Sequence, residues 1–308
     1  MSDIVISEFM DGAAIEAAFK GRDVTYDPTL VDHPERLSAC LADCRGLIVR
    51  NRTQVRGALL EAAPSLKVVG RLGVGLDNID TTACTARGVV VRPATGANDL
   101  SVTEYVITAA LMLLRRAWFA SERIAGGLWP RMDLIGRELA GKRLGLVGFG
   151  AIARLTASKA AALDMKVAAF DPFLADDHPA WKDVERLSLD ALLASCDVVS
   201  LHTPLTEQTR RMINAAALGR MRQGSILINA ARGGIVDEAA LAAALEAGRL
   251  GGAALDVFET EPLTASAAHL FQGLPNLILT PHIAGVTEES NVRVSAVTAR
   301  AVLEVLNA

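Results

Sequence analysis

The sequence has few cysteines, few aromatic residues and no excess of basic charge. Aromatics make up 4% of the 308 residues, and 31 Lys and Arg against 35 Asp and Glu give a net charge of −4. Such a chain does not attract a phosphate backbone or an anionic membrane, so we expect neither nucleic acid nor membrane as a partner. The most apolar stretch covers ten residues, 105–114, whereas a membrane-spanning helix needs roughly 20.

The cysteines are Cys40, Cys44, Cys84 and Cys196, and they lack the paired C-x-x-C spacing of zinc and redox sites. We expect reduced, mostly buried thiols, and no grouping of His, Cys or carboxylates has metal-ligand spacing. The first residues, MSDIVISEFMDG, carry acids where a secretory signal would have basic residues and a longer apolar run. These features predict a soluble cytoplasmic protein without a metal.

Short β-rich runs alternate with Ala- and Leu-rich segments of helical period, which is typical of parallel sheets built from βαβ units. The first series of runs covers 4–6, 46–49, 67–71 and 89–91, and the second covers 143–148, 166–170, 198–201, 225–229, 252–256 and 277–279. The second series predicts a Rossmann-type sheet. At about 150 residues per domain, the length favours two domains.

A long apolar helix is expected at 102–118, between the two series, because Ser101 and Glu104 match the S/T-x-x-E capping box. After Ile283 the pattern is helical again to the last residue, and we infer that this helix returns to the first domain. We therefore predict a discontinuous domain of residues 1–97 and 284–308, and a second domain of residues 98–283.

A glycine motif opens the second series. Residues 144–153, LGLVGFGAIA, read as a buried strand that enters a G-x-G-x-x-A turn and a helix. Gly148 allows the tight turn, Gly150 lets the backbone approach a pyrophosphate, and Ala153 permits close helix packing. The next strand ends at Asp171, 21 residues after Gly150, where a carboxylate binds the adenosine ribose and repels a 2′-phosphate. The motif predicts NAD rather than NADP; the alternative is an ordinary glycine turn with a surface Asp.

Polar residues follow three further strands, in the segments 229–237 (NAARGGIVD), 255–262 (LDVFETEP) and 280–285 (TPHIAG). Open α/β sheets bind their ligands at this edge. Together with 71–80 (RLGVGLDNID), these segments resemble the NAD-dependent D-isomer-specific 2-hydroxyacid dehydrogenases, which include phosphoglycerate, glycerate, lactate and formate dehydrogenases. The resemblance covers nearly the whole chain. It implies an α/β fold with two Rossmann-like or flavodoxin-like parallel-sheet domains and an active site in the cleft between them.

The resemblance also implies a catalytic triad. His282 matches the family's catalytic histidine, and imidazole titrates near neutral pH. Glu261 falls at the position of the acid that orients this ring, and Arg232 matches the arginine whose planar donors bind the substrate carboxylate. By residue type alone each would be a solvated or structural residue, but the shared sheet edge favours catalysis. We assign His202, near the same edge, a structural role.

Further contacts follow from the same resemblance. Asp256 falls where the family contacts the nicotinamide carboxamide, and the other implied cofactor residues are Ala151, Ile152, Thr203, Ala230, Ala231 and Gly285. Backbone amides of Gly73, Val74 and Gly75 would bind the substrate carboxylate, and Asn98 matches a family asparagine at the hinge. Residues 92–96 read RPATG where the commoner pattern has Asn-Ala-Pro, which leaves the local pocket shape open.

The substrate is suggested by Arg50, Asn51 and Arg52, which resemble the family loop that faces the substrate. Two guanidinium groups beside Arg232 exceed what a monocarboxylate requires. We therefore predict a 2-hydroxy or 2-keto acid with a second anion, with 3-phosphoglycerate and sulfolactate as the first candidates. Solvated surface arginines are the alternative, under which glyoxylate, hydroxypyruvate and other unphosphorylated acids remain open.

Two other functions compete with that of a dehydrogenase. A nucleotide-sensing protein is the rival function, because the family resembles transcriptional corepressors that keep the fold and the triad; a hydrolase that uses bound NAD without net turnover is a third. The sequence shows no extra polar segment for recruiting partners, so we expect a dehydrogenase.

The apolar helix from Val102 and the loop containing Trp129 predict a homodimer through residues 102–129, unless Trp129 caps its own domain.

Overall fold

The computed structural model describes residues 2–116 and 118–308. The chain divides into two compact units, Met1–Asn98 with Val286–Ala308 and Asp99–Gly285. The predicted boundaries, after residue 97 and after residue 283, lie one and two residues earlier than these. No helix in the described part of the chain is long and apolar enough to cross a membrane.

The first unit contains a parallel sheet with the strand order β2-β1-β3-β4-β5. Its strands are β1 (Ile4–Ile6), β2 (Val24–Tyr26), β3 (Gly46–Val49), β4 (Val68–Arg71) and β5 (Val90–Pro93). This order is that of flavodoxin-like folds. Strand β2 was not predicted, because it is a three-residue edge strand without a fully buried residue.

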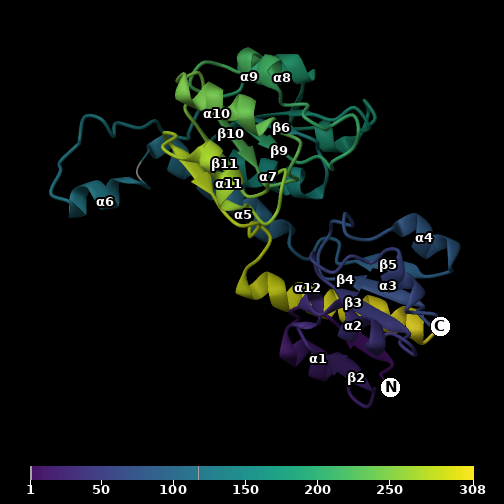
Figure 1. The fold of residues 1–308 in the computed structure, drawn as a ribbon. Coiled ribbons are helices and arrows are strands. Elements are labelled where there is room, and N and C mark those ends of the chain that lie inside the picture. Colours follow the sequence, from purple (N-terminus) through teal and green to yellow (C-terminus); the bar gives the residue numbers. More distant parts are fainter. Residues whose placement is uncertain (1, 117) are drawn as a thin grey trace. The chain divides into compact units, whose positions relative to one another are not determined.

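Helices cover both faces of this sheet. They are α1 (Gly12–Phe19), α2 (Pro34–Cys40), α3 (Ala58–Glu61), α4 (Thr81–Ala86) and α12 (Glu288–Leu306), with a short 3-10 turn, η1 (Leu30–Asp32). Helix α12 lies along the strands of the unit (Figure 1), and Val302 packs in one core cluster with Ile48 and Val68. At Gly70 of β4 a Cβ would come within 2.5 Å of Val302, so this glycine lets α12 approach the sheet. The last helix thus belongs to the first unit.

The second unit contains a parallel sheet with the order β12-β11-β10-β9-β6-β7-β8. Its strands are β6 (Arg143–Val147), β7 (Lys166–Phe170), β8 (Glu185–Arg186), β9 (Val198–Leu201), β10 (Ile226–Asn229), β11 (Gly252–Leu255) and β12 (Leu277–Leu279). The order reverses between β6 and β9, and this is the point where doubly wound sheets bind ligands. The predicted Rossmann-type sheet is confirmed, except that the exposed two-residue strand β8 was missed.

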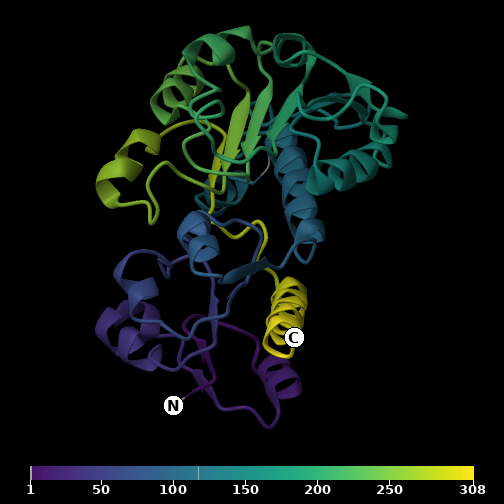
Figure 2. The ribbon, with the colours of Figure 1, turned by 90° about the vertical axis from the view of Figure 1, so that its right-hand side faces the viewer.

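Helices flank the second sheet on both faces (Figure 2). They are α5 (Asp99–Arg115), α6 (Ala120–Ala125), α7 (Ala151–Ala161), α8 (Leu189–Ser195), α9 (Ala215–Arg220), α10 (Glu238–Glu246) and α11 (Ala265–Ala268), with the 3-10 turns η2 (Pro179–Trp181) and η3 (His269–Phe271). Residues of α5 and α7 share one hydrophobic cluster, and residues of α8, α9 and α10 share another. Two cores therefore sandwich the strands, which explains why the central strands are mostly apolar on both faces.

Helix α5 begins and ends at other residues than predicted. The expected cap at Ser101 is wrong, because the helix already begins at Asp99 and Ser101 is buried within its first turns. An acid at the first position is itself favourable near a helix N-terminus. The helix also ends earlier than predicted, at Arg115, and Arg116 has a left-handed backbone with φ 54°.

The segment from Trp118 to Gly136, which contains α6, extends away from the sheet of its own unit (Figure 1). Its apolar side chains are exposed: Trp129 by 80%, Met132 by 74%, Ile135 by 62% and Leu128 by 58%. Contiguous exposed apolar side chains of this size are typical of interaction surfaces.

Candidate active site

The glycine turn lies between β6 and α7, as predicted. Gly148 has φ 87°, and a Cβ there would lie 2.6 Å from the carbonyl oxygen of His202, so only glycine fits. Gly150 precedes α7 without a side-chain cap, and the space where its Cβ would point is open. Ala153 is fully buried against the sheet. The N-terminus of this eleven-residue helix therefore has no side-chain cap and has open space at Gly150, which fits a pyrophosphate.

Asp171 follows β7 and is tied to this turn. One carboxylate oxygen accepts the N–H of Phe149 at 2.8 Å, and the other accepts the N–H of Phe173 at 2.9 Å. On the other side of the turn, the buried hydroxyl of Thr203 has no hydrogen-bond partner among the described residues. Ala151 and Ile152 are the first two residues of α7 and are at least partly exposed. These groups suit a dinucleotide that passes over the turn.

Arg232 lies in the loop after β10, which Asn229 holds in place. The Asn229 amide accepts the N–H of Ala231 at 3.1 Å and donates to the Arg232 carbonyl at 2.9 Å. The half-buried Arg232 side chain donates to the Ala231 carbonyl at 2.6 Å. Ala230 and Ala231 are partly exposed along the same loop.

Gly233 brings this loop against the loop after β11. A Cβ at Gly233 would overlap the carbonyl of Phe258, so a larger residue would separate the two loops. The second loop is also held by Glu238, which accepts the N–H of Glu259 at 2.6 Å. The close contact places Arg232 and Glu261 on neighbouring loops of one sheet edge.

Glu261 and His282 form a hydrogen-bonded pair. The Nδ1 atom of His282 lies 2.7 Å from Oε2 of Glu261, and Oε1 of Glu261 accepts the N–H of Phe258 at 3.0 Å. Burial opposes ionisation of this carboxyl, but the bonds from His282 and Phe258 and the positive charge of Arg232 bring the pKa of Glu261 below its usual value. The short contact and the lowered pKa of Glu261 show that His282 has an ionised partner at Nδ1. This leaves Nε2 for another group.

Asp256 lies next to this pair and is 1% exposed. Its carboxylate accepts the N–H groups of Ile283 and Ala284, both at 2.8 Å, and the hydroxyl of Thr280 at 2.6 Å. Burial raises the pKa of Asp256 despite these bonds. The side chain predicted to contact the cofactor therefore also holds the backbone on the far side of His282. Gly285, a predicted cofactor residue, ends the second unit.

In the first unit, Glu8 fixes the loop that follows β3. This carboxylate is 4% exposed and accepts three backbone N–H groups, from Arg50 at 2.8 Å, Thr53 at 3.0 Å and Arg52 at 3.1 Å. The buried Asn78 amide donates to the Thr53 carbonyl at 2.7 Å. Sequence reasoning missed Glu8, because no local signal links an acid near β1 to a loop more than forty residues away.

The two arginines of this loop have different surroundings. Arg52 forms an exposed ion pair with Asp32. Arg50 donates to the amide oxygen of Asn291 at 2.7 Å, and its guanidinium carbon lies 5.9 Å from the centre of the Phe9 ring. Burial lowers the pKa of Arg50, although the negative charge of Glu8 opposes this shift. No carboxylate among the described residues forms an ion pair with Arg50. Asn51, between them, is exposed.

The remaining predicted residues lie after β4 and at the end of the first unit. Gly73 has φ 148°, and the Arg71 side chain occupies the space that a Cβ would need. Val74 is exposed by 37%, whereas Gly75 is buried. The buried Oδ1 of Asn98 has no hydrogen-bond partner in the described part of the chain.

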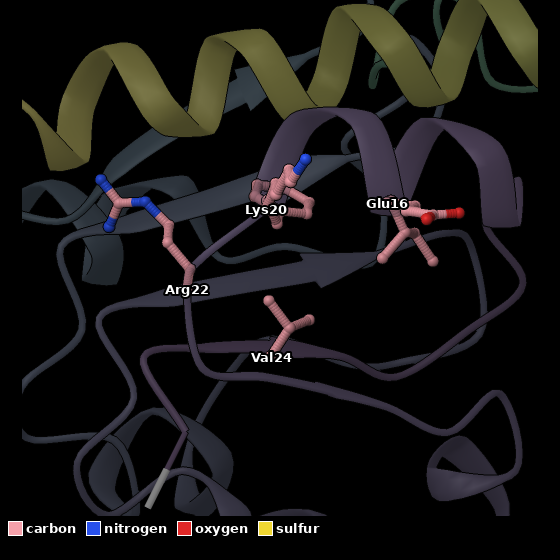
Figure 3. A pocket seen from close by; sticks show the side chains of 6 residues that line it. Glu16, Lys20, Arg22 and Val24 are labelled. Carbon is pink, nitrogen blue, oxygen red and sulfur yellow. The ribbon is translucent and has the colours of Figure 1, made fainter.

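A pocket of about 230 Å³ lies elsewhere on the first unit, at α1 and β2 (Figure 3). It is lined by Ile15, Glu16, Phe19, Lys20, Arg22 and Val24. None of these is a predicted site residue, and Arg22 is already paired with Asp3 at 2.7 Å. Among the described residues, no group of His, Cys, Asp and Glu could hold a metal ion.

Comparison with known proteins identifies the family of the chain. A model of the NAD-binding domain of D-isomer specific 2-hydroxyacid dehydrogenases matches residues 107–284. An (S)-sulfolactate dehydrogenase from Chromohalobacter salexigens is 55% identical over 299 residues, which are 97% of this chain and 96% of that protein. A D-3-phosphoglycerate dehydrogenase from Archaeoglobus fulgidus is 41% identical over 82% of this chain, which spans only 48% of that protein.

Among solved structures, a D-lactate dehydrogenase from Aquifex aeolicus, complexed with NAD and lactic acid, aligns with a TM-score of 0.84. The sequences are 28% identical, and the alignment covers 99% of this chain and 95% of that one. The expected family, fold and cofactor are thereby confirmed. The chain belongs to the D-isomer specific 2-hydroxyacid dehydrogenases, and it is an NAD-dependent oxidoreductase of 2-hydroxy acids.

Proposed function

We propose that the substrate of this dehydrogenase carries a second anionic group, and that sulfolactate is the first candidate. The observation that carries the proposal is Arg50, a partly buried cation that forms no ion pair with a carboxylate of the described residues, on a loop that three N–H bonds to Glu8 hold in place. The dehydrogenase from Chromohalobacter salexigens, similar over nearly its whole length, is named for sulfolactate. 3-Phosphoglycerate is the second candidate, because the phosphoglycerate dehydrogenases are similar over a smaller part of their length.

His282 is the proposed general base and acid. In oxidation its Nε2 takes the proton of the substrate hydroxyl while the C–H bond at C2 breaks, and a 2-keto acid forms. NAD, when bound, accepts the hydride. The Glu261 carboxylate at 2.7 Å stabilises the imidazolium that results and holds the ring so that Nε2 faces the substrate. In reduction the same residues work in reverse.

Arg232 is the proposed partner of the substrate carboxylate and of the oxygen on C2. A guanidinium offers several donors in one plane, which a lysine does not. Its neighbour Gly233 keeps this loop close to the Glu261 loop, so the cation and the catalytic pair share one sheet edge. Backbone N–H groups of Gly73, Val74 and Gly75, together with Asn98, are proposed as further substrate contacts.

The proposed cofactor site consists of Gly148, Gly150, Ala151, Ile152, Asp171, Thr203, Ala230, Ala231, Asp256 and Gly285. The open space before α7 and the unpaired buried hydroxyl of Thr203 support it. The Asp171 carboxylate would repel the 2′-phosphate of NADP, and the following Pro172 and Phe173 provide no cation to neutralise that phosphate.

Arg50 is a better candidate than Arg52 for the second anion. Arg52 is already paired with Asp32. The Arg50 side chain instead lies beside a neutral amide and an aromatic ring, and the charge of Glu8 acts on it without forming an ion pair. A sulfonate or phosphate would therefore gain a charge-assisted hydrogen bond without displacing an acid.

We also propose a homodimer through residues 102–129. The exposed Trp129 and Leu128, and the extension of their segment away from its sheet, support this assembly. A cytoplasmic location is proposed because the cysteines are free, and thiols stay reduced in that compartment.

The proposal is tested by initial rates of NADH oxidation with sulfopyruvate, 3-phosphohydroxypyruvate, hydroxypyruvate, glyoxylate and pyruvate. We expect kcat/KM for sulfopyruvate or 3-phosphohydroxypyruvate to exceed that for pyruvate by at least about tenfold, the effect of about 1.4 kcal/mol. An equal or higher kcat/KM for pyruvate or glyoxylate would contradict the second anion. Sulfopyruvate and 3-phosphohydroxypyruvate, compared in the same series, decide between a sulfonate and a phosphate.

A further inference from the structure

We propose that Tyr105 is a positioning residue for His282, acting from helix α5 through Thr280 and Asp256. The inference rests on the proposed role of His282 in proton transfer. It concerns a hydroxyl that no sequence motif marks, since Tyr105 and Thr280 are 175 residues apart.

The three residues form a continuous chain of hydrogen bonds. The Tyr105 hydroxyl lies 2.7 Å from the Thr280 hydroxyl, which lies 2.6 Å from Oδ1 of Asp256. A carboxylate only accepts, so the Thr280 proton is directed to Asp256. The Thr280 oxygen is then an acceptor, and Tyr105 must donate to it. The chain therefore has one direction, from the tyrosine to the carboxylate.

Asp256 in turn fixes the backbone of the loop that contains His282, here called the histidine loop. Its two oxygens accept the N–H groups of Ile283 and Ala284, the residues that directly follow His282. On the other side, the His282 N–H donates to the Thr280 carbonyl at 3.0 Å. Thr280 and Asp256 thus hold the backbone both before and after the histidine.

The histidine loop needs such support because His282 has a left-handed backbone with φ 59°. This conformation is unfavourable for a residue with a Cβ, and it persists only where neighbouring bonds enforce it. A loop that relaxes would move the ring from the Glu261 carboxylate and from the substrate hydroxyl. Small displacements of a catalytic group lower kcat more than they change cofactor binding.

Tyr105 is suited to a permanent donor role. Burial raises its pKa to about 12, so the hydroxyl stays protonated over the working range of the enzyme. Its ring packs against the cluster of α5, α7 and the sheet, which fixes the hydroxyl in front of Thr280. Phenylalanine would keep this packing and remove only the donor.

The test is a double-mutant cycle with Tyr105→Phe and Thr280→Val. We expect each single variant to lower kcat by about threefold to tenfold, the effect of one lost hydrogen bond, with KM for NADH within twofold of the unmodified enzyme. The double variant should be no slower than the slower single variant, because both substitutions break the same chain. Losses that multiply in the double variant, or a kcat of Tyr105→Phe equal to that of the unmodified enzyme, would overturn the proposal.

Two further variants separate positioning from general damage. Thr280→Ser keeps the hydroxyl and should retain kcat within about twofold, even if Thr280→Val folds poorly. Tyr26→Phe is the matched control. Tyr26 is the other of the two tyrosines, and its hydroxyl donates to the Met10 carbonyl in the first unit. A loss of kcat in Tyr26→Phe equal to that in Tyr105→Phe would also contradict the proposal.

His282→Ala in the same assay shows which idea fails. If it retains activity, the proposed role of His282 is wrong and Tyr105 has nothing to position. If it is inactive while Tyr105→Phe is fully active, only the positioning role of Tyr105 is refuted.

Discussion

Replacing Arg50 by glutamine should change the choice of substrate rather than the chemistry. The variant removes the guanidinium charge near Phe9 and Asn291 but leaves the backbone N–H that donates to Glu8 at 2.8 Å. The loop should therefore keep its conformation. A hydrogen bond to a charged group contributes about 1.5–3 kcal/mol, which corresponds to roughly a 10- to 150-fold loss of kcat/KM for the dianionic keto acid.

The assay compares sulfopyruvate with pyruvate in both the unmodified enzyme and the variant. With pyruvate the loss should stay within about threefold, since that substrate has no second anion. Arg52→Gln is the matched control: its guanidinium already pairs with Asp32, so its loss should be below about threefold with both substrates. Equal losses on sulfopyruvate and pyruvate in Arg50→Gln, or a larger loss in Arg52→Gln, would refute the assignment.

Glu261→Gln should move the alkaline limb of the reduction rate to lower pH, because a neutral amide no longer stabilises positive charge on the His282 ring; an unchanged pH profile would make Glu261 structural. The unmodified enzyme should prefer NAD to NADP by a large factor. Asp171→Ala with Pro172→Arg should relax or invert that preference while weakening NAD binding, since the Phe149 N–H loses its acceptor, and comparable kcat/KM for both cofactors before mutation would contradict the role of Asp171. Light scattering at micromolar concentration should give a dimer, and Trp129→Glu should shift it toward monomer, whereas Phe173→Glu, an aromatic that is 94% exposed outside the segment, should not; a monomeric unmodified protein would refute the assembly.

Much of the fold is predictable from the sequence because its strands are buried on both faces. β3 and β9 are fully buried in the cores of their units, and their bounds were predicted correctly. The strands that were missed, β2 and β8, are short and lie at sheet edges, where burial does not select apolar residues. Ser101 was assigned as a cap because its spacing to Glu104 fits, but tertiary burial of Ser101 outweighed this local pattern.

The candidate site was predictable where its residues follow strands in a fixed order. Glu261 and His282 come after neighbouring parallel strands, so their loops had to meet at one edge. Contacts between distant segments were not predictable. The contrast between Arg50 and Arg52 depends on Asp32, Phe9 and Asn291, and nothing in the sequence pairs them.

The central claim is that His282 moves the substrate proton. Its most direct test is kcat of His282→Ala, measured with the dissociation constant for NADH in the same preparation. Proton transfer by a positioned side chain is worth about 10²–10⁴ in rate, so kcat should fall at least a hundredfold while NADH binding changes by less than about threefold. His269→Ala, an exposed histidine of the same unit, should retain full activity. A kcat of His282→Ala within threefold of the unmodified enzyme would remove His282 from the mechanism.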